Sequence, residues 1–351
     1  MMQIMKSILI NGDRACLQID GMNRVLLDIT RSLDAIVEKN KYELIIPANV
    51  NREYYDRIKG FKNIKIKKTI LPYFKFWTFI FVDVVGLFSH RTVINFCNRN
   101  SVFGGGINML HDIIPIRFYG NKDKKYLKRI ERLLNTSDCL IVPSEFTRED
   151  IKKTMQVNCK MHVLHNGWQH YPEIEEDNEI FNEYKLIKKG EYYFSLSSIS
   201  PHKNFKFIYE VAVRNPNIMF VVAGAMNRGH GFDYKELENL LFVGRISDQK
   251  AKALMMNCRA FIFPSLYEGA GIPPLEALSC NVPVLASDIK VVHEYCGDAV
   301  RYFDPDDYDI DIEEVLKEKV SDPKDVLGLL SWEKTAQDLK TIIDSYKEGI
   351  V

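Results

Sequence analysis

The chain has 351 residues, enough for two domains of ordinary size that each bury a hydrophobic core. A composition with 46% hydrophobic and 27% charged residues is that of a soluble globular protein. The net charge is zero, yet residues 1–168 carry 27 basic and 16 acidic residues, whereas the remainder carries 20 and 31. We therefore expect the basic half to meet something anionic, and charge alone fits nucleic acid and a membrane surface equally.

The seven cysteines are scattered along the chain, with no CxxC pair and no accompanying histidine cluster. This pattern argues against a disulfide framework or a zinc site and favours a reducing cytoplasm. The N-terminal residues are expected to form a first buried strand. They do not resemble a signal peptide, because no small-residue cleavage site follows them.

The first elements predicted along the chain are a strand, a helix and a second strand. Residues 7–10 are apolar enough for a central strand, and apolar side chains recur at helical spacing over residues 22–37. Residues 42–46 then predict the second strand. The loop before the helix ends at Gly21, and a single glycine before a helix most simply marks a turn.

Residues 58–88 are unusual because a lysine-rich stretch precedes an aromatic-rich one. Lys75 and Asp83 interrupt the apolar run, and its uncharged core, residues 76–82, is far shorter than the ~20 residues that cross a bilayer. Two interpretations stay open. The segment lies in a membrane interface, as basic and aromatic stretches can, or it forms an edge strand and a core helix under the sheet.

The rest of the N-terminal half continues the alternation of strands and helices. Further strands are expected at residues 92–96, 139–144 and 162–165, and one more ends in His111 and Asp112. Residues 121–135 predict a basic amphipathic helix, and Ser144 is the expected N-cap of the helix after it. The dipeptide Asn166-Gly167 is typical of a turn and marks the end of the first domain.

The second half repeats the alternation. A strand over residues 192–199 leads through a short loop into a helix that begins near Phe205. Lys203 opens that helix, so its ammonium and the helix N-terminus would point together toward a phosphate. His202 beside it is expected to be only partly cationic at neutral pH, with an ordinary pKa near ~6.5. Strands follow at residues 218–224 and 240–244, and Ser247 is the expected N-cap of the next helix.

Residues 261–287 combine a strand, a glycine-rich turn, a helix and a second strand. Pro273 and Pro274 suit the first turn of the helix, where a missing N–H costs nothing. Free backbone N–H groups and the helix dipole favour an anion at such a turn. Glu268 and Glu276 would repel that anion and are better suited to accept hydrogen bonds from hydroxyls. The combination favours a phosphorylated, polyhydroxylated ligand such as a nucleotide sugar.

This stretch resembles the signature of the family 4 glycosyltransferases, an E-x7-E pair within a pattern like PS-x-x-EG-x-G-x-P-x-LEA. Glu268 and Glu276 match the pair, and the framework positions that match are Gly269, Gly271, Pro273, Leu275 and Ala277. One departure is Ala270, where the family often has an aromatic residue. The resemblance implies an α/β fold of the GT-B type, with two Rossmann-like doubly wound domains that face each other across a cleft.

The implied domains are residues 1–167 on the acceptor side, residues 168–330 for the nucleotide sugar, and a C-terminal helix over 331–351 that returns to the first domain. Glu268 and His111 are the implied catalytic residues. The implied donor-binding residues are Lys203, Ser198, Gly269, Ala270, Gly271, Ile272, Glu276, Arg245, Ile246 and Gly21. Ser198 stands where the family commonly has an arginine, and Trp168, Gln169 and His170 stand where it usually has an acidic residue.

The function implied is retaining transfer of a hexose or deoxyhexose from a nucleotide-diphosphate sugar to a saccharide or a lipid-linked saccharide. No metal or other cofactor is expected, because Lys203 and the N–H groups of residues 269–272 would stabilise the leaving diphosphate. The expected setting is the cytoplasm, with peripheral contact to the anionic inner membrane face as one interpretation. Bacterial polysaccharide, lipopolysaccharide or capsule synthesis suits it by analogy. The donor base, sugar, acceptor, linkage and oligomeric state stay open.

Two alternatives remain beside this function. A sugar-nucleotide epimerase or a phosphorylase could share the architecture, although the cofactor lysine of such a phosphorylase cannot be placed in this sequence. A non-catalytic nucleotide-sugar-binding protein is the other alternative, since the expected arginine is missing at Ser198. Nucleic-acid binding is rejected, because no recognition module accompanies the basic half.

Overall fold

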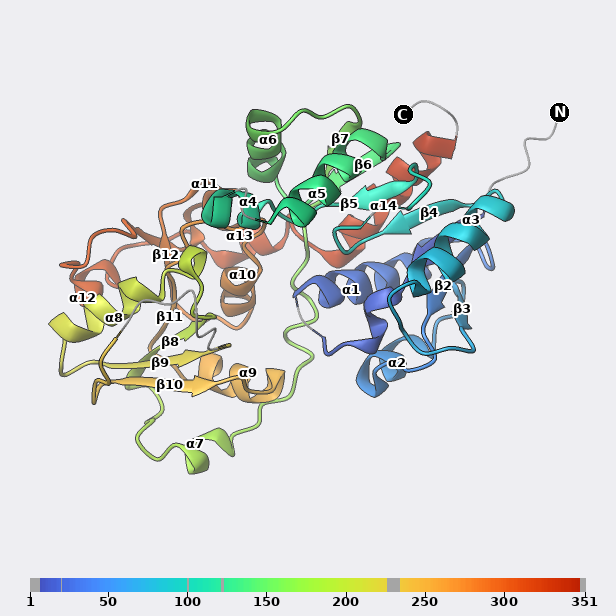
Figure 1. Ribbon diagram of the computed structural model, residues 1–351. Helices are drawn as coiled ribbons and strands as arrows, with labels where there is room; N and C mark the ends of the chain where they lie inside the picture. Colours follow the sequence, from blue (N-terminus) through green and yellow to red (C-terminus); the bar gives the residue numbers. More distant parts are fainter. Residues whose placement is uncertain (1–6, 20, 100, 121–122, 226–233, 348–351) are drawn as a thin grey trace. The chain divides into compact units, whose positions relative to one another are not determined.

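The computed structural model describes residues 7–19, 21–99, 101–120, 123–225 and 234–347. The sequence expectations for residues 1–6 and for the first two residues of the helix predicted at 121–135 lie outside the described residues. The contacts divide the chain into two compact units (Figure 1). Unit 1 comprises Met1–Gly167 with Trp332–Val351, and unit 2 comprises Trp168–Ser331.

Unit 1 is built on a parallel sheet. Its strands, within the described residues, follow the order β3-β2-β1-β4-β5-β6-β7. Their bounds are Ile8–Asn11 (β1), Tyr42–Ile46 (β2), Lys65–Lys68 (β3), Thr92–Asn95 (β4), Ile107–Met109 (β5), Cys139–Val142 (β6) and Lys160–Val163 (β7). Every neighbouring pair is parallel. Parallel strands need crossover connections, and a helix supplies this connection between most successive strands of the unit.

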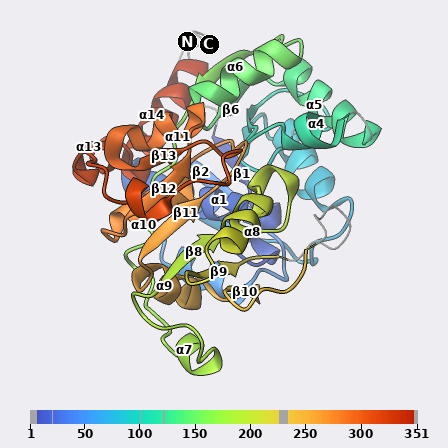
Figure 2. The same ribbon diagram turned by 90° about the vertical axis from the view of Figure 1, so that its left-hand side faces the viewer.

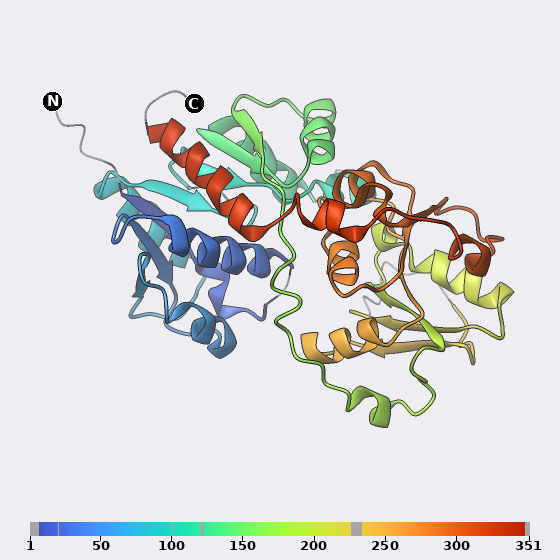
Figure 3. The ribbon, with the colours of Figure 1, turned by 180° about the vertical axis from the view of Figure 1, so that it is seen from behind.

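The helices of unit 1 cover both faces of this sheet. Helix α1, Gly21–Ile36, packs against the C-terminal helix α14, Trp332–Lys347 (Figure 3). Thr335 Oγ1 of α14 also donates to the carbonyl oxygen of His165 at 2.6 Å. The other helices are α2 (Arg52–Ile58), α3 (Val85–Phe88), α4 (Ile114–Tyr119), α5 (Lys124–Thr136) and α6 (Glu145–Thr154). Gly21 is the first residue of α1 and not part of the loop before it.

The aromatic-rich part of residues 58–88, residues 69–88, has one buried face and one exposed face, and we call it the aromatic segment. The side chains of Trp77 and Val82 are fully buried and pack on Leu9, Ile45 and Val93 of the sheet. In contrast, Ile70 is 88%, Phe76 58% and Phe88 80% exposed. The edge-strand and core-helix interpretation is therefore correct for one face, while a membrane contact of the other face stays a prediction. Every helix in the described residues is too short or too polar to cross a bilayer.

Unit 2 repeats the architecture with the strand order β10-β9-β8-β11-β12-β13 in its described residues. The strands are Tyr192–Leu196 (β8), Met219–Ala223 (β9), Leu240–Gly244 (β10), Ala260–Phe263 (β11), Val284–Ser287 (β12) and Arg301–Phe303 (β13). The helices are α7 (Ile180–Glu183), α8 (Phe205–Arg214), α9 (Asp248–Met256), α10 (Ile272–Ser279), α11 (Lys290–Cys296), α12 (Ile312–Val315) and α13 (Pro323–Leu327).

The sheet of unit 2 lies between α8 and α9 (Figure 2). On one face, Phe207 and Val211 of α8 pack in a cluster with Tyr193. On the opposite face, the Tyr192 hydroxyl donates to the carbonyl oxygen of Leu254 in α9 at 2.6 Å. Successive side chains of β8 thus enter cores on opposite faces, as strand alternation requires. Both sheets are doubly wound, as the sequence predicted.

Each sheet changes its direction of winding between two neighbouring strands, β1 and β4 in unit 1 and β8 and β11 in unit 2. Doubly wound sheets bind ligands beyond the carboxyl ends of the strands at such a switch point. Within the described part of the chain, the loops concerned are residues 12–19, 96–99 and 101–106 in unit 1, and residues 197–204 and 264–271 in unit 2. The switch point of unit 2 therefore gathers most of the predicted donor-binding residues.

Candidate active site

The first loop at the switch point of unit 2 carries Ser198 and Lys203. A short 3₁₀ turn, Pro201–Lys203, is separated from α8 by Asn204 with φ of 51°, a left-handed conformation that asparagine tolerates. Ser198 Oγ lies 2.9 Å from Ser200 Oγ, so the position of the expected arginine holds a hydroxyl pair. Lys203 ends the turn and reaches away from this pair toward the second loop.

A tight backbone contact shapes this first loop. Gly224, which follows β9, has φ of 151°, and a Cβ atom there would lie 2.0 Å from the carbonyl oxygen of Ser197. No side chain fits that distance, so the residue after β9 must be glycine for Ser197 and Ser198 to keep their backbone positions.

The second loop carries Glu268 and leads into α10. Gly271 is the N-cap, Ile272 the first helical residue, and Pro273 and Pro274 stand in the first turn as predicted. The backbone at Gly271 is held close to α11, because a Cβ there would lie 3.0 Å from Tyr295 Cβ. The glycine therefore lets the loop approach the neighbouring helix. In the first turn of α10, Ile272 carries a backbone N–H, whereas Pro273 and Pro274 carry none.

Lys203 and Glu268 join the two loops. Lys203 Nζ lies 2.7 Å from Glu268 Oε1, and the side chains are 22% and 11% exposed. The ammonium also lies 5.9 Å from the centre of the Phe263 ring at the end of β11. The pair presents no net negative charge to an arriving anion, whereas the Glu268 carboxylate alone would repel one.

His202 differs from its sequence expectation. Burial and the neighbouring Lys203 ammonium lower its pKa to about 4, although the Glu268 carboxylate opposes the shift. The imidazole is therefore neutral at pH 7 and not partly cationic as predicted, because its surroundings penalise the charged form. Of the two adjacent side chains, Lys203 supplies the positive charge of this turn.

Glu276 lies in the second turn of α10 and contacts a residue that the sequence analysis did not assign to the site. Its Oε1 atom is 2.8 Å from Nε2 of His170, and the two side chains are 9% and 1% exposed. His170 follows the unit boundary and is 106 positions away in the sequence. In the sequence, the only indication of this contact was that residues 168–170 depart from the family pattern. That departure did not indicate that Glu276 is the partner of His170.

The remaining predicted residues lie elsewhere. Arg245 and Ile246 follow β10, an edge strand of unit 2, and Arg245 is exposed. Gly21 and His111 belong to unit 1. The ring atom Nε2 of His111 lies 2.6 Å from the carbonyl oxygen of Phe96, so the imidazole links the segment after β5 to the segment after β4. A sugar contact of His111 stays a prediction.

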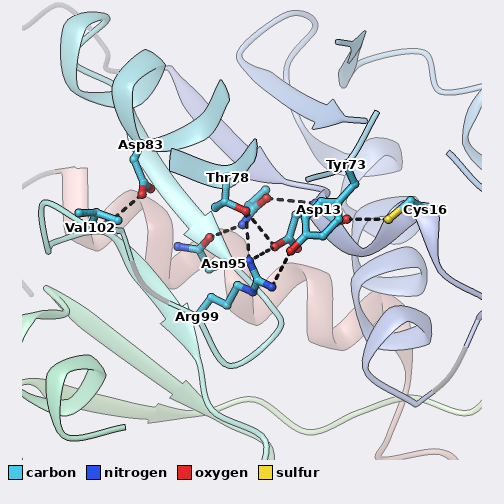
Figure 4. A network of polar contacts seen from close by, with 9 residues as sticks. Asp13, Cys16, Tyr73, Thr78, Asp83, Asn95, Arg99 and Val102 are labelled. Atoms are coloured by element: carbon cyan, nitrogen blue, oxygen red, sulfur yellow. Dashed lines mark hydrogen bonds and ion pairs between the residues drawn. The ribbon is translucent and has the colours of Figure 1, made fainter. Parts of the chain in front are cut away.

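The switch point of unit 1 is built differently, from a network of side chains (Figure 4). Arg99 Nη1 lies 2.8 Å from Oδ2 of the buried Asp13, and Arg99 Nη2 donates to the Tyr73 hydroxyl at 2.9 Å. Arg99 also donates to Thr78 Oγ1 at 3.2 Å. These contacts tie the loops after β1 and β4 to the aromatic segment.

Among the described residues, His, Cys, Asp and Glu side chains form no group of three that could hold a metal ion. Independence from a metal stays a prediction about the reaction. In the described part of unit 2, the switch point offers the Lys203 ammonium and the N-terminus of α10 as positive groups.

Two family comparisons cover most of the chain. Residues 19–169 match the family described as Glycosyltransferase Family 4, and residues 176–327 match the glycosyl transferases group 1. The O-antigen chain mannosyltransferase RfbU of Salmonella typhimurium is 28% identical over 211 residues, which cover 56% of this chain and 56% of the relative. The chain thus matches little more than half of the length of that curated relative.

Solved structures show the same fold. Sucrose-phosphate synthase from Thermosynechococcus elongatus has a TM-score of 0.71 at 12% identity, with 98% of this chain and 100% of that chain covered. Anabaena HepE in complex with UDP-glucose has a TM-score of 0.66 at 13% identity, with 97% and 99% covered. The predicted GT-B class of fold is therefore confirmed.

The fold is of the GT-B class, and the loop with the E-x7-E pair stands at the switch point of unit 2. The chain belongs to the family 4 glycosyltransferases, as both halves match families of this type.

Proposed function

We propose that the chain transfers a hexose or deoxyhexose from a nucleotide-diphosphate sugar to a saccharide or lipid-linked saccharide acceptor. The observation that carries the proposal is the Lys203–Glu268 pair at the switch point of unit 2, beside the N-terminus of α10. The pair combines a cation for a diphosphate with a carboxylate for sugar hydroxyls. The mannosyltransferase RfbU and the UDP-glucose complex of HepE support the same class of chemistry.

The proposed chemistry follows from the charges that develop. Cleavage of the bond between the anomeric carbon and the phosphate oxygen leaves negative charge on the diphosphate and positive character on the sugar ring. Lys203 and the N–H groups of residues 269–272 would stabilise the diphosphate, because fixed donors need no reorganisation during the reaction. Glu268 would then accept hydrogen bonds from the sugar hydroxyls and stabilise the positive ring.

We propose that the reaction retains the anomeric configuration. The acceptor oxygen forms its bond to the anomeric carbon on the face from which the diphosphate leaves. The acceptor hydroxyl proton passes to the leaving phosphate oxygen, so no covalent sugar–enzyme intermediate is needed. No metal takes part in this scheme.

A donor screen tests the proposal. UDP-, GDP-, dTDP- and ADP-sugars are incubated with the full chain, and nucleotide release is measured with and without a chelator. We expect release from one donor, insensitive to the chelator, and an unchanged anomeric configuration of the product by NMR. Inversion would refute the proposed mechanism. Binding without release even with saccharide acceptors would favour the non-catalytic alternative, which the hydroxyl pair at Ser198 keeps open.

We further propose that unit 1 works at an anionic membrane surface, where a lipid-linked acceptor would reside. Two observations support this setting. The edge strand β3 exposes Lys65, Lys67 and Lys68, and the segment after it exposes Ile70, Phe76 and Phe88. Lysines attract anionic head groups, and aromatic side chains enter the interface between head groups and acyl chains.

A further inference from the structure

The segment that follows the unit boundary, residues 168–174, is fixed within unit 2 by side chains on both sides of His170. Trp168 Nε1 donates to the carbonyl oxygen of Leu327 at 3.0 Å. The ammonium of the buried Lys252, on α9, donates to three carbonyl oxygens, those of Tyr171, Pro172 and Ile174, at 3.1, 3.0 and 2.5 Å. A buried ammonium needs such partners, and here they hold the backbone beside His170 in place.

From this fixed backbone the His170 imidazole reaches one oxygen of Glu276. The Nε2–Oε1 distance is 2.8 Å, and the imidazole is 1% exposed. Within the described residues, no hydrogen bond reaches the second carboxylate oxygen, Oε2. The imidazole therefore holds the carboxylate through one atom and leaves the other to a ligand.

A histidine suits this task better than lysine or arginine. An imidazole N–H donates a directional hydrogen bond to a carboxylate from a planar ring, which, unlike an ammonium or a guanidinium, need not carry a charge to donate. A carboxylate is in turn a strong acceptor of hydrogen bonds from hydroxyl groups. Side chains that bind ligands lose precision when their own rotamers are not held by neighbouring contacts.

We propose that His170 is a positioning residue, which orients Glu276 so that Oε2 accepts a hydrogen bond from a ribose hydroxyl of the nucleotide. The inference rests on the proposed function, in which a nucleotide sugar is the donor. It adds a residue from the segment after the unit boundary to the nucleotide site and assigns it a selective effect, the preference for ribonucleotides over deoxyribonucleotides.

The test compares affinities of the full chain for UDP, GDP and ADP and for their 2′-deoxy and 3′-deoxy counterparts by calorimetry. For the nucleotide bound best, we expect His170→Phe to weaken ribonucleotide binding about tenfold, the worth of one charge-assisted hydrogen bond. Affinity for the counterpart that lacks the contacted hydroxyl should stay unchanged. His170→Gln, which retains an N–H donor, should restore part of the preference.

Two further variants separate the explanations. His293→Phe removes an exposed histidine 2.6 Å from Asp288 in the same unit and should change nothing. Glu276→Gln should abolish the ribonucleotide preference. If it does so while His170→Phe leaves the preference intact, the positioning role is wrong and the donor site stands. If the wild-type chain binds none of the nucleotides, the proposed function fails and this inference with it. Equal losses for ribo- and deoxyribonucleotides in His170→Phe would indicate a merely structural role and overturn the proposal.

Discussion

The two units differ in the side chains that join the loops at the switch points of their sheets. Both sheets have a switch point between their first strand and the strand that follows the first crossovers. In unit 1, Asp13 and Arg99 join the two loops, and Tyr73 and Thr78 extend the network to the aromatic segment (Figure 4). In unit 2, the loops are joined by Lys203 and Glu268 beside a glycine-rich backbone. One switch point thus holds a neighbouring segment, whereas the other offers donors for a ligand.

The charged groups at the switch point of unit 1 contact one another and the aromatic segment, in contrast to the groups that unit 2 offers to a ligand. Burial opposes the charge of Arg99, but the Asp13 carboxylate and the Tyr73 hydroxyl outweigh it and raise the pKa of the guanidinium. Asp83, on the same aromatic segment, accepts from the Val102 N–H at 2.9 Å, and burial raises the pKa of its carboxyl. These polar groups of unit 1 form their hydrogen bonds and ion pairs with one another, so removing one of them should destabilise the fold. In unit 2, the same kind of removal should mainly affect the ligand.

The largest expected effect is that of Lys203→Ala on nucleotide release. Removal of one preorganised donor to a developing oxyanion lowers rates by about 10²–10³-fold, and the same loss of rate is expected here. Steady-state rates with the donor found by the screen measure it. Lys206→Ala, which removes an exposed lysine in the first turn of α8, is the matched control and should keep the wild-type rate. Equal rates for both variants would refute the role of Lys203.

Next in size is the effect of Arg99→Ala on stability. The variant leaves the buried Asp13 carboxylate without its ion partner. Because Arg99 is 32% exposed, water screens part of the interaction, and we expect the free energy of unfolding to fall by about 2 kcal/mol. Urea unfolding measures the free energy. Arg52→Ala removes a side chain that is 97% exposed and 3.9 Å from Asp56, so its change should stay below about 0.5 kcal/mol. A loss as small for Arg99→Ala would contradict the contrast between the two units.

A pH effect should come from His202, whose pKa is lowered to about 4 by burial. Between that value and the ordinary pKa the unfolded chain binds a proton that the folded chain does not, so stability falls as the pH falls. The slope from this group is at most about 1.4 kcal/mol per pH unit. Urea unfolding at pH 7 and pH 5 should show a smaller pH dependence for His202→Asn than for wild type. The exposed control His90→Asn should retain the wild-type dependence.

The smallest effect is expected at the membrane. Phe76→Ser and Phe88→Ser together should reduce co-sedimentation with vesicles of anionic phospholipid several-fold, because each removes an exposed aromatic ring from the interface. Leu186→Ser and Leu329→Ser, which are 68% and 67% exposed in unit 2, form the matched control pair. A similar reduction in both pairs would mean that exposed hydrophobic area in general, and not unit 1, drives the association.

Much of the fold could be predicted because its signals are local. Caps are an example, since Ser144 and Ser247 accept from the Thr147 and Lys250 N–H groups as expected. Other features depend on distant contacts. The Glu276 partner His170 is brought close only by the fold, and the neutral state of His202 follows from burial. The lysine-rich and aromatic-rich segment at residues 58–88 fitted two interpretations, because a sequence shows which side chains are apolar but not which of them the sheet covers.

Gly224 illustrates how a mutational scan of this chain would need to be interpreted. A Cβ at this position would lie 2.0 Å from the carbonyl oxygen of Ser197, and any replacement must displace the loop that carries Ser198. A selection for activity would therefore find Gly224 to be as intolerant of substitution as the residues that contact the donor. Gly224 itself has no side chain that could contact the donor. A parallel screen for the amount of folded protein would help to distinguish residues that shape the loop from residues that contact the donor.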